Sequence, residues 1–293
     1  MMTKELQITV ENRTYSVMVS DQVEALLAAK AAGRAVLGLW DSRHPERAPF
    51  GVPYLIDCQE EITEEYLERI VRRQLGMPWK ITETKRLILR EFAPEDWGEL
   101  QEMVGENQTE DRNGLQEAMK KAEEEAERGR EGIKMNHWDT CPEAFSNYPS
   151  FLAYLEHQYP FYEYGIWAVI QQGSGRLIGA AGIWDMEIPA AAEIGYWIRP
   201  SFQRRGYGQE AVQAILQYVE EALADSIHSI YAKIRKGNLP SRKLVQRLGF
   251  RQLTEEKASD GACGVTDCSE GTGSTLLQYR FDWSSLPHPD NRE

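Results

Sequence analysis

The 293-residue sequence predicts an α/β protein with a small first domain, residues 1–80, and a larger second domain, residues 81–293. Two observations favour this. In the first domain, short apolar strands and two helices follow in the order strand, strand, helix, strand, strand, helix. In the second domain, strands alternate with helices, and the strand at residues 192–198 leads through a glycine loop into a long amphipathic helix.

The first domain contains no catalytic motif. Its predicted elements are a hairpin (residues 6–10 and 14–19), a helix (22–32), two buried strands (35–40 and 52–56) and a helix that begins at Thr63. Ser20 or Asp21 is expected to cap the first helix, and residues 76–79 to act as a linker. His44 beside Asp41 is interpreted as part of a solvated turn rather than as a site.

The second domain is predicted to begin with a strand at residues 86–92. The further elements are a helix (94–104), a charged helical insertion (103–148), strands (164–170, 176–184 and 192–198), a helix that ends near Leu223, a strand (227–234), a helix (238–248) and a closing strand pair (252–258 and 276–283). The closing pair is joined by a glycine-rich loop, which is expected to be mobile and could serve as a lid.

The loop at residues 203–208 is predicted to bind an anion. Gly206 and Gly208 lack a Cβ, so the backbone can turn tightly and approach a ligand. The first N–H groups of the following helix have no partner within the helix, and with the helix dipole they favour a phosphate. A simple tight connection is the alternative reading of these two glycines.

Two nucleotide motifs fit this loop poorly. Residues 206–211 formally match the dinucleotide pattern G-x-G-x-x-A, but the next strand ends at Arg235 without the acidic residue that binds a ribose. A P-loop requires Lys followed by Ser or Thr, and Gln209 and Glu210 stand at those positions.

The loop resembles the acetyl-CoA loop of the GNAT N-acetyltransferases, Gln/Arg-x-x-Gly-x-Gly/Ala, at Gln203, Gly206 and Gly208. Residues 238–250 resemble the family's Asn-x-x-Ser…Gly-Phe segment. Residues 84–90 look like the first strand of the RimJ/RimL-like branch. The resemblance spans residues 82–283 and implies a GNAT fold, a mixed and mostly antiparallel sheet flanked by helices, here preceded by a small α/β domain.

The resemblance also implies acetyl-CoA as a co-substrate. The strands at residues 192–198 and 230–234 are expected to splay apart and to hold the pantetheine arm in the gap. The implied cofactor-binding residues are Tyr196, Trp197, Ile198, Gln203, Arg204, Arg205, Gly206, Tyr207, Gly208, Gln209, Asn238 and Ser241. The charged insertion stands where relatives of the family shape the acceptor pocket. The alternative is that it forms an inert surface helix.

Acetyl transfer to an amine needs a base and an acid. Glu193 is the candidate base because several relatives carry a Glu on this strand; the alternative is a carboxylate in solvent at a strand end. Asp185 and Glu187 are the reserves. In many relatives the acid is a tyrosine seven residues after the Asn. This chain has Val245 at that position, so Ser241 or a water is expected to act as the acid.

Three aromatic residues have two readings, as the lining of the acceptor pocket or as part of the core. They are Trp184, Tyr196 and Trp197.

The composition restricts the partners. A formal net charge of −13 disfavours a general nucleic-acid binder and would attract a cationic amine. No apolar signal or membrane segment is recognised, so we expect a cytoplasmic protein that does not bind membranes. The four cysteines suit reduced thiols, and no metal is expected; they are Cys58, Cys141, Cys263 and Cys268.

The sequence therefore predicts an acetyl-CoA-dependent N-acetyltransferase. An α-amine, with a pKa near ~8, loses its proton more easily than a lysine near ~10.4, which favours a protein or peptide N-terminus as the acceptor. The alternatives are an acetyltransferase for a small amine and a non-catalytic CoA-binding regulatory module. A monomer and a homodimer both stay open.

Overall fold

The computed structural model describes residues 2–41, 43–44, 49, 51–57, 59, 62–106, 143–253 and 276–283. The chain divides into two compact units. One consists of Met1–Lys80, Glu91–Trp97 and Glu143–Glu163, and the other of Ile81–Arg90, Gly98–Pro142 and Tyr164–Glu293. The division of the sequence into domains 1–80 and 81–293 stays a prediction.

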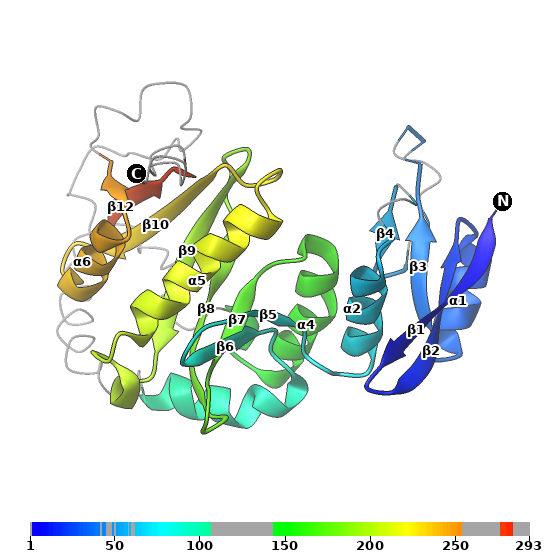
Figure 1. Cartoon of the computed structure of the whole chain (residues 1–293), viewed down its shortest axis with the longest axis horizontal. Helices are drawn as coiled ribbons and strands as arrows, with labels where there is room; N and C mark the ends of the chain where they lie inside the picture. Colours follow the sequence, from blue (N-terminus) through cyan, green and yellow to red (C-terminus); the bar gives the residue numbers. More distant parts are fainter. Residues whose placement is uncertain are drawn as a thin grey trace, which may run out of the picture. The chain divides into compact units, whose positions relative to one another are not determined.

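The first unit contains a four-stranded sheet (Figure 1) with the order β1-β2-β3-β4. Its elements are β1 (Thr3–Val10), β2 (Arg13–Ser20), α1 (Val23–Ala31), β3 (Ala35–Leu39), β4 (Leu55–Ile56) and α2 (Glu64–Gln74). The β1 and β2 strands form an antiparallel hairpin, whereas β3 is parallel to both β2 and β4. The predicted order of elements is confirmed.

Local details of this unit refine the prediction at one place and depart from it at two. The hairpin turn uses Glu11 and Asn12 in left-handed conformations, with φ of 48° and 63°. Gln22 is the N-cap of α1 and no side chain caps it directly, although Ser20 Oγ accepts a hydrogen bond from the Gln22 N–H at 3.0 Å. The β4 strand is only two residues long, shorter than the strand predicted at residues 52–56.

The α2 helix is the element that closes the core of this sheet. Thr63 caps it as predicted, because its side chain accepts from the Tyr66 N–H. The apolar face of α2 packs against the inward side chains of β1 to β3 in one cluster of buried residues: Val10, Val17, Val19, Ala35, Leu37, Tyr54, Leu67, Ile70 and Val71.

Helix α4 (Tyr148–Tyr162) also belongs to the first unit and follows the charged insertion predicted at residues 103–148. Asn147 caps it by accepting from the Ser150 N–H at 2.9 Å. Phe151 of α4 packs edge-on against Phe92 and Phe145, with ring centroids 5.9 and 5.8 Å away.

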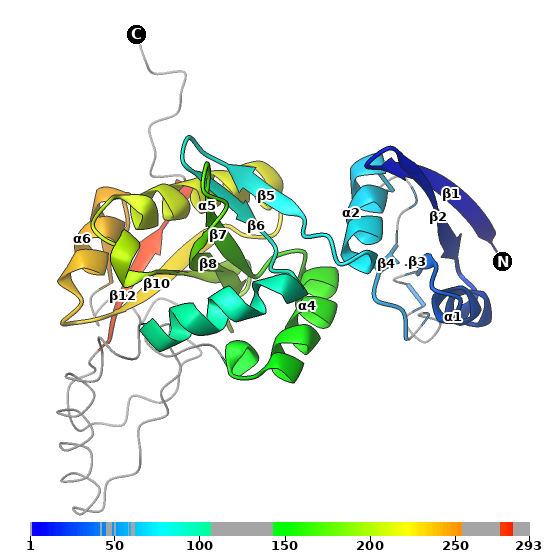
Figure 2. The same cartoon turned by 90° about the horizontal axis from the view of Figure 1, so that it is seen from below.

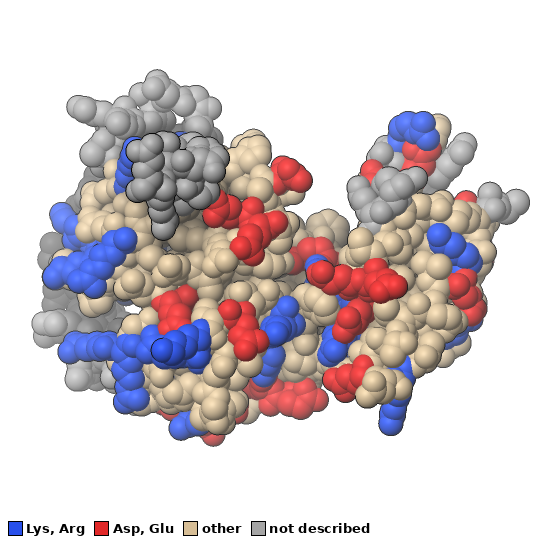
Figure 3. Space-filling model, viewed as in Figure 1, with Lys and Arg blue, Asp and Glu red and all other residues tan. Residues whose placement is uncertain are grey.

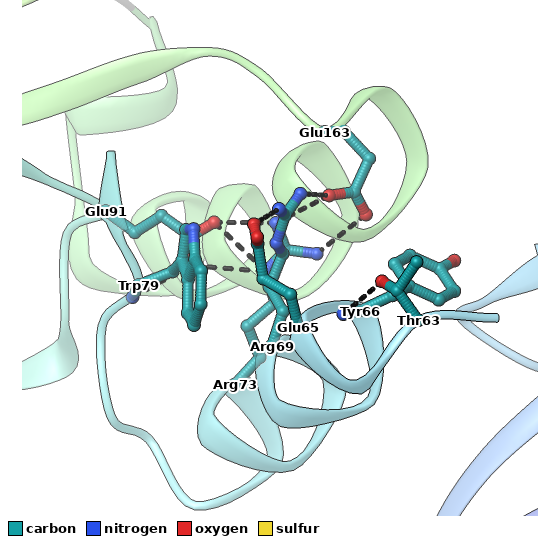
Figure 4. Close-up of polar contacts among 8 residues, drawn as sticks. All are labelled: Thr63, Glu65, Tyr66, Arg69, Arg73, Trp79, Glu91 and Glu163. Carbon is teal, nitrogen blue, oxygen red and sulfur yellow. Dashed lines mark hydrogen bonds and ion pairs between the residues drawn. The ribbon is translucent and has the colours of Figure 1, made fainter. Parts of the chain in front are cut away.

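A buried ion cluster joins α2 to the end of α4 (Figure 4). The Arg73 guanidinium donates to Glu91 at 2.7 Å and to Glu163 at 2.9 Å, and the side chains of Arg73 and Glu91 are 7% and 2% exposed. Arg69 also pairs with Glu163 and lies 5.1 Å from the ring centroid of Trp79. Burial raises the pKa of the Glu91 carboxyl, and the Arg73 charge beside it opposes that shift.

Removal of Arg73 should therefore destabilise the first unit strongly. We expect Arg73→Ala to lower the free energy of unfolding by about 3 to 5 kcal/mol, because Glu91 would stay buried without its cation. Arg72→Ala is the matched control: Arg72 is more exposed and pairs with Glu68 on the same helix, so its loss should cost less than about 1 kcal/mol. Chemical denaturation measures both, and equal losses would contradict the assignment.

The second unit is built on an eight-stranded sheet with the order β11-β12-β10-β9-β8-β7-β6-β5. The strands are β5 (Lys80–Glu83), β6 (Leu87–Arg90), β7 (Ile166–Gln171), β8 (Leu177–Asp185), β9 (Ala191–Ile198), β10 (Ser229–Arg235), β11 (Arg251–Gln252) and β12 (Leu276–Phe281). The β9 and β10 strands are parallel. The pairs β6-β7, β7-β8, β8-β9, β10-β12 and β11-β12 are antiparallel. The predicted mixed, mostly antiparallel sheet is confirmed.

Helices cover both faces of this sheet. Helix α5 (Tyr207–Ala222) and the helix of residues 97–106 lie on opposite faces (Figure 2), and α6 (Leu239–Arg247) follows β10. Nearly every residue of β7 and β8 is consequently buried, which explains why these strands read as continuous apolar runs. None of the helices in the described ranges has the length and apolar character needed to cross a membrane.

Three further predictions, which concern residues of both units, need correction or fall outside the described residues. The segment before residue 84 contributes a strand, β5, whereas the sequence indicated only a linker near it. A 3-10 turn, Pro94–Asp96, precedes the helix that begins at residue 97. Most of the charged insertion and the glycine-rich loop, together with Cys58, Cys141, Cys263 and Cys268, lie outside the described residues.

Candidate functional site

The loop between β9 and α5 presents backbone amides at the start of a helix. Gly206 is the N-cap of α5 with φ of 83°, a left-handed conformation that favours glycine, and no side chain caps the helix there. The Glu210 N–H donates to the Gly206 carbonyl at 3.0 Å, so the N–H groups just before Glu210 lie ahead of the helical hydrogen-bond ladder. With the positive end of the helix dipole, they form an arrangement that binds anions.

Basic side chains surround this loop. Figure 3 shows Lys and Arg side chains gathered on one face near the start of α5. Arg204 and Arg205 are exposed, and the Arg205 guanidinium lies 5.6 Å from the ring centroid of Phe202. This local charge is opposite in sign to the net charge of the chain, so it favours an anionic ligand at this place.

Arg86 and Glu210 anchor the loop to the sheet. The Glu210 carboxylate in the first turn of α5 accepts from Thr84 Oγ1 and from Arg86 Nε, each at 2.6 Å. Arg86 also donates from Nη1 to the Arg205 carbonyl at 3.0 Å and lies 4.5 Å from the ring centroid of Tyr207. One arginine therefore fixes the loop backbone and the first helical side chain together.

Two further contacts set the path of the loop. Gln203 donates from Nε2 to the carbonyl of Ile198 at 2.9 Å, which closes the loop onto the end of β9. Gly208 packs directly on Tyr196: a Cβ at Gly208 would lie 2.8 Å from a ring carbon of that tyrosine. The second glycine is required by this close packing, and the first by the left-handed turn.

The β9 and β10 strands diverge, as predicted. Their parallel pairing joins residues 191–193 to residues 229–231 and ends at Glu193 and Tyr231. Yet β9 continues to Ile198 and β10 to Arg235. Beyond Glu193, the edge of β9 that faces β10 is therefore free of ladder hydrogen bonds from that strand.

Glu193 lies at the vertex of this divergence and is 3% exposed. The reading of Glu193 as a strand-end residue in solvent is wrong, because its carboxylate is buried and forms an ion pair with Lys233 Nζ at 2.9 Å. Glu193 is three residues from Tyr196, so the two side chains point to opposite faces of the sheet. Tyr196 packs on α5, and Glu193 therefore faces away from α5.

Trp184 lies beside Glu193 on the same face, since the two are direct partners in the antiparallel pair of β8 and β9. Trp197 is also on this face by alternation and is partly exposed. Asp185 is exposed and accepts a hydrogen bond from the Tyr164 hydroxyl, and Glu187 follows in the connection to β9. By the same alternation Asp185 lies on the opposite face, so this face combines two tryptophans with one buried carboxylate, Glu193, a composition suited to a cationic amine.

Asn238 and Ser241 lie at the start of α6. Asn238 is its N-cap and accepts from the Ser241 N–H at 3.2 Å. The Ser241 hydroxyl lies 2.9 Å from the hydroxyl of Tyr196. Val245 is buried with an exposure of 2%, so this position supplies packing and no proton.

Sequence reasoning missed three residues of this site. They are Lys233, which pairs with Glu193, and Arg86 and Glu210, which hold the loop. The alternation of β10 places Lys233 on the face of Tyr231, but only the register of β9 against β10 brings it to Glu193. No set of three or more His, Cys, Asp or Glu residues in the described ranges is arranged to hold a metal ion.

Parts of this sequence are similar to known proteins. The family described as the acetyltransferase (GNAT) domain matches residues 86–251. The putative ribosomal N-acetyltransferase YdaF of Bacillus subtilis is 35% identical over 88 residues, which cover 30% of this chain and 46% of that protein. The uncharacterized N-acetyltransferase YnaD of Bacillus subtilis is 37% identical over 60 residues, covering 20% of this chain and 34% of that protein.

Among solved structures, the chain is similar to RimL, a ribosomal L7/L12 alpha-N-protein acetyltransferase in complex with coenzyme A. The TM-score is 0.47 with 18% sequence identity, over 69% of this chain and 97% of that chain. The chain spans less than half the length of the two curated relatives. The family match covers more than half of this chain, so the protein belongs to the GNAT acetyltransferase family.

The loop anchor should make stability depend on pH. Burial would raise the pKa of Glu210, but hydrogen bonds from Thr84 and Arg86 and the Arg86 charge outweigh it, so the pKa lies below its usual value of 4.5. A carboxyl group with a lowered folded-state pKa stabilises the fold above its unfolded pKa, and this contribution is lost as pH falls through the folded pKa.

We expect Glu210→Gln to lower the free energy of unfolding by about 1 to 3 kcal/mol at neutral pH, as for hydrogen bonds to a charged group. The difference from wild type should shrink as pH falls from about 5 to about 3. Denaturant titrations at several pH values measure it. Glu220→Gln, an exposed residue of the same helix, is the control, and a difference for Glu210→Gln that is constant across this range would contradict the anchor.

Proposed function

We propose that this protein is an acetyl-CoA-dependent N-acetyltransferase that acetylates a primary amine, with a protein or peptide α-amine as the preferred acceptor. One observation carries the proposal: the backbone amides at the start of α5 follow the end of β9, and the point where β9 separates from β10 holds a buried carboxylate, Glu193. An anion cradle and a candidate base are thus at two points along one strand.

Acetyl-CoA fits this arrangement in two parts. Its diphosphate would accept hydrogen bonds from the amides at the start of α5, next to Arg204 and Arg205. Its pantetheine arm carries two amide groups, which would pair with the free edge of β9 beyond Glu193 in the manner of an added strand. The residues proposed to contact the donor are Tyr196, Trp197, Ile198, Gln203, Arg204, Arg205, Gly206, Tyr207, Gly208, Gln209, Asn238 and Ser241.

The acceptor amine would bind on the face of Glu193, Trp184 and Trp197. The donor elements α5 and α6 approach Tyr196 from the other face. The acetyl carbon would therefore meet the amine where β9 and β10 separate. In this arrangement Glu193 takes a proton from the amine, directly or through a water, and Lys233 holds the carboxylate in place.

The preference for an α-amine rests on proton affinity. An α-amine, with a pKa near ~8, is partly neutral at physiological pH, whereas a lysine side chain near ~10.4 is almost wholly charged. A single buried carboxylate that already pairs with Lys233 supports the easier of the two deprotonations. A putative ribosomal N-acetyltransferase among the relatives agrees with a protein acceptor.

The first test separates turnover from binding. Purified protein should release free thiol from acetyl-CoA in the presence of a peptide with a free α-amine. A peptide of the same sequence with a blocked N-terminus and one lysine should release little, because its amine is more fully protonated. Release only with small polyamines would favour a small-molecule acceptor. Tight binding of acetyl-CoA without release for any amine would favour a regulatory module instead.

Glu193→Gln tests the base. We expect the turnover number to fall by about 10² to 10⁴-fold, the usual contribution of a positioned general base. The dissociation constant for acetyl-CoA, measured by calorimetry, should stay close to wild type, since Glu193 faces away from α5. Glu220→Gln on the exposed side of α5 is the matched control. A large loss in Asp185→Asn together with an unchanged rate in Glu193→Gln would transfer the role to Asp185.

A further inference from the structure

Two hydroxyl groups face each other across the open end of the diverging strands. Tyr196 projects from β9, beyond the last residue that pairs with β10, and Ser241 projects from the first turn of α6, which follows β10. Their oxygen atoms lie 2.9 Å apart. This hydrogen bond links the two walls between which the thioester arm would pass.

The ring of Tyr196 is fixed before any ligand binds. Its ring carbons lie so near Gly208 that a Cβ there would be 2.8 Å away, so α5 supports the ring from one side. The backbone of Tyr196 pairs with Ala181 in the central part of the sheet. The phenol hydroxyl is therefore held by rigid elements, and its direction toward Ser241 is set by the fold.

The tyrosine is the better donor of the two groups. A phenol is more acidic than an aliphatic alcohol, and the serine oxygen is the better acceptor. Burial raises the pKa of the Tyr196 phenol, so it keeps its proton at physiological pH. When Tyr196 donates to Ser241, the proton of Ser241 is free to point elsewhere.

Ser241 lies where a negative charge would be stabilised. It occupies the third position of α6, a nine-residue helix, and the dipole at a helix start favours anions. During acetyl transfer the C–N bond forms, the C–S bond breaks and its electron pair goes to sulfur. The proton of the amine leaves on the Glu193 side, so the sulfur needs a separate hydrogen-bond donor. The buried Val245 does not provide one.

We propose that Tyr196 is a positioning residue for thioester cleavage, which donates to Ser241 and thereby directs the Ser241 proton toward the departing sulfur. The inference rests on the proposed acetyl transfer and extends it to the departure of the thiolate. Tyr196 itself need not touch the reacting atoms, because it acts through the serine.

Single-turnover rates with acetyl-CoA and the peptide amine test this pair. We expect Ser241→Ala to lower the rate by about 10 to 100-fold and Tyr196→Phe by about 3 to 10-fold, in line with charge-assisted and neutral hydrogen bonds. The double variant should be no slower than Ser241→Ala alone, because the tyrosine acts only through the serine. Multiplied losses in the double variant would overturn the proposal, as would a wild-type rate for Tyr196→Phe.

A second donor separates a role in leaving-group stabilisation from a merely structural one. The selenium analogue of acetyl-CoA releases a selenolate, which is a more stable anion than a thiolate and needs less hydrogen bonding. The defects of Tyr196→Phe and Ser241→Ala should shrink with this donor, because a selenolate depends less on the Ser241 proton. Equal defects with both donors would overturn the proposal.

Tyr218→Phe, in the middle of α5, is the control for loss of a tyrosine hydroxyl, and it should keep the wild-type rate with both donors. The wild-type protein reports on the proposed function separately. Turnover by wild type with no effect of Tyr196→Phe removes only the inference about Tyr196. Absence of turnover by wild type with any amine removes the proposed function itself.

Discussion

The early end of the pairing between β9 and β10 is the constraint on which the site depends. Only three residue pairs join the two strands before they separate. Had the ladder continued, the edge of β9 would be saturated and Glu193 would be one of many interior positions. Because the ladder ends there, the buried carboxylate of Glu193 lies where the two strands separate. Beyond this point, β9 with α5 forms one side of the gap, and β10 with α6 forms the other.

The loop before α5 illustrates how two glycines serve two unrelated needs. Gly206 adopts a left-handed conformation that other residues enter at a cost, and Gly208 leaves room for an aromatic ring. Neither need is visible in a short glycine pattern. The contacts of Arg86 add a third requirement, since the same side chain holds the loop carbonyl and the carboxylate of Glu210. These contacts hold the loop in one conformation, and an anion proposed to bind there would meet amides that need little further ordering.

Much of the fold was predictable from the sequence, because its elements have strong local signals. The periodicity of α5, the cap at Thr63 and the apolar runs of β7 and β8 all led to correct elements. Short elements such as β4 and β5 have too few residues for a periodic pattern, and their assignment depends on partners distant in the chain. The predicted cap of α1 was wrong because Ser20 Oγ accepts from the N–H of Gln22, the residue just before the helix, and not from an N–H of the helix itself.

The candidate site was predictable only in part. The loop residues and Asn238 follow a local motif, whereas the pairs Glu193 with Lys233 and Tyr196 with Ser241 depend on strand register and on the position of α6. No spacing along the chain encodes either pair. Sequence patterns gave the residue types, and tertiary structure decided which of them meet.

The ion cluster around Arg73 has a consequence for dissecting the chain. The family match begins at residue 86, which suggests a convenient cut at the linker. Glu91 and Glu163 lie inside that match, yet their cationic partners, Arg69 and Arg73, lie outside it. A fragment cut at the linker would keep both carboxylates without their cationic partners. The segment that matches the family therefore depends on the first eighty residues for its stability, and the two should not be separated.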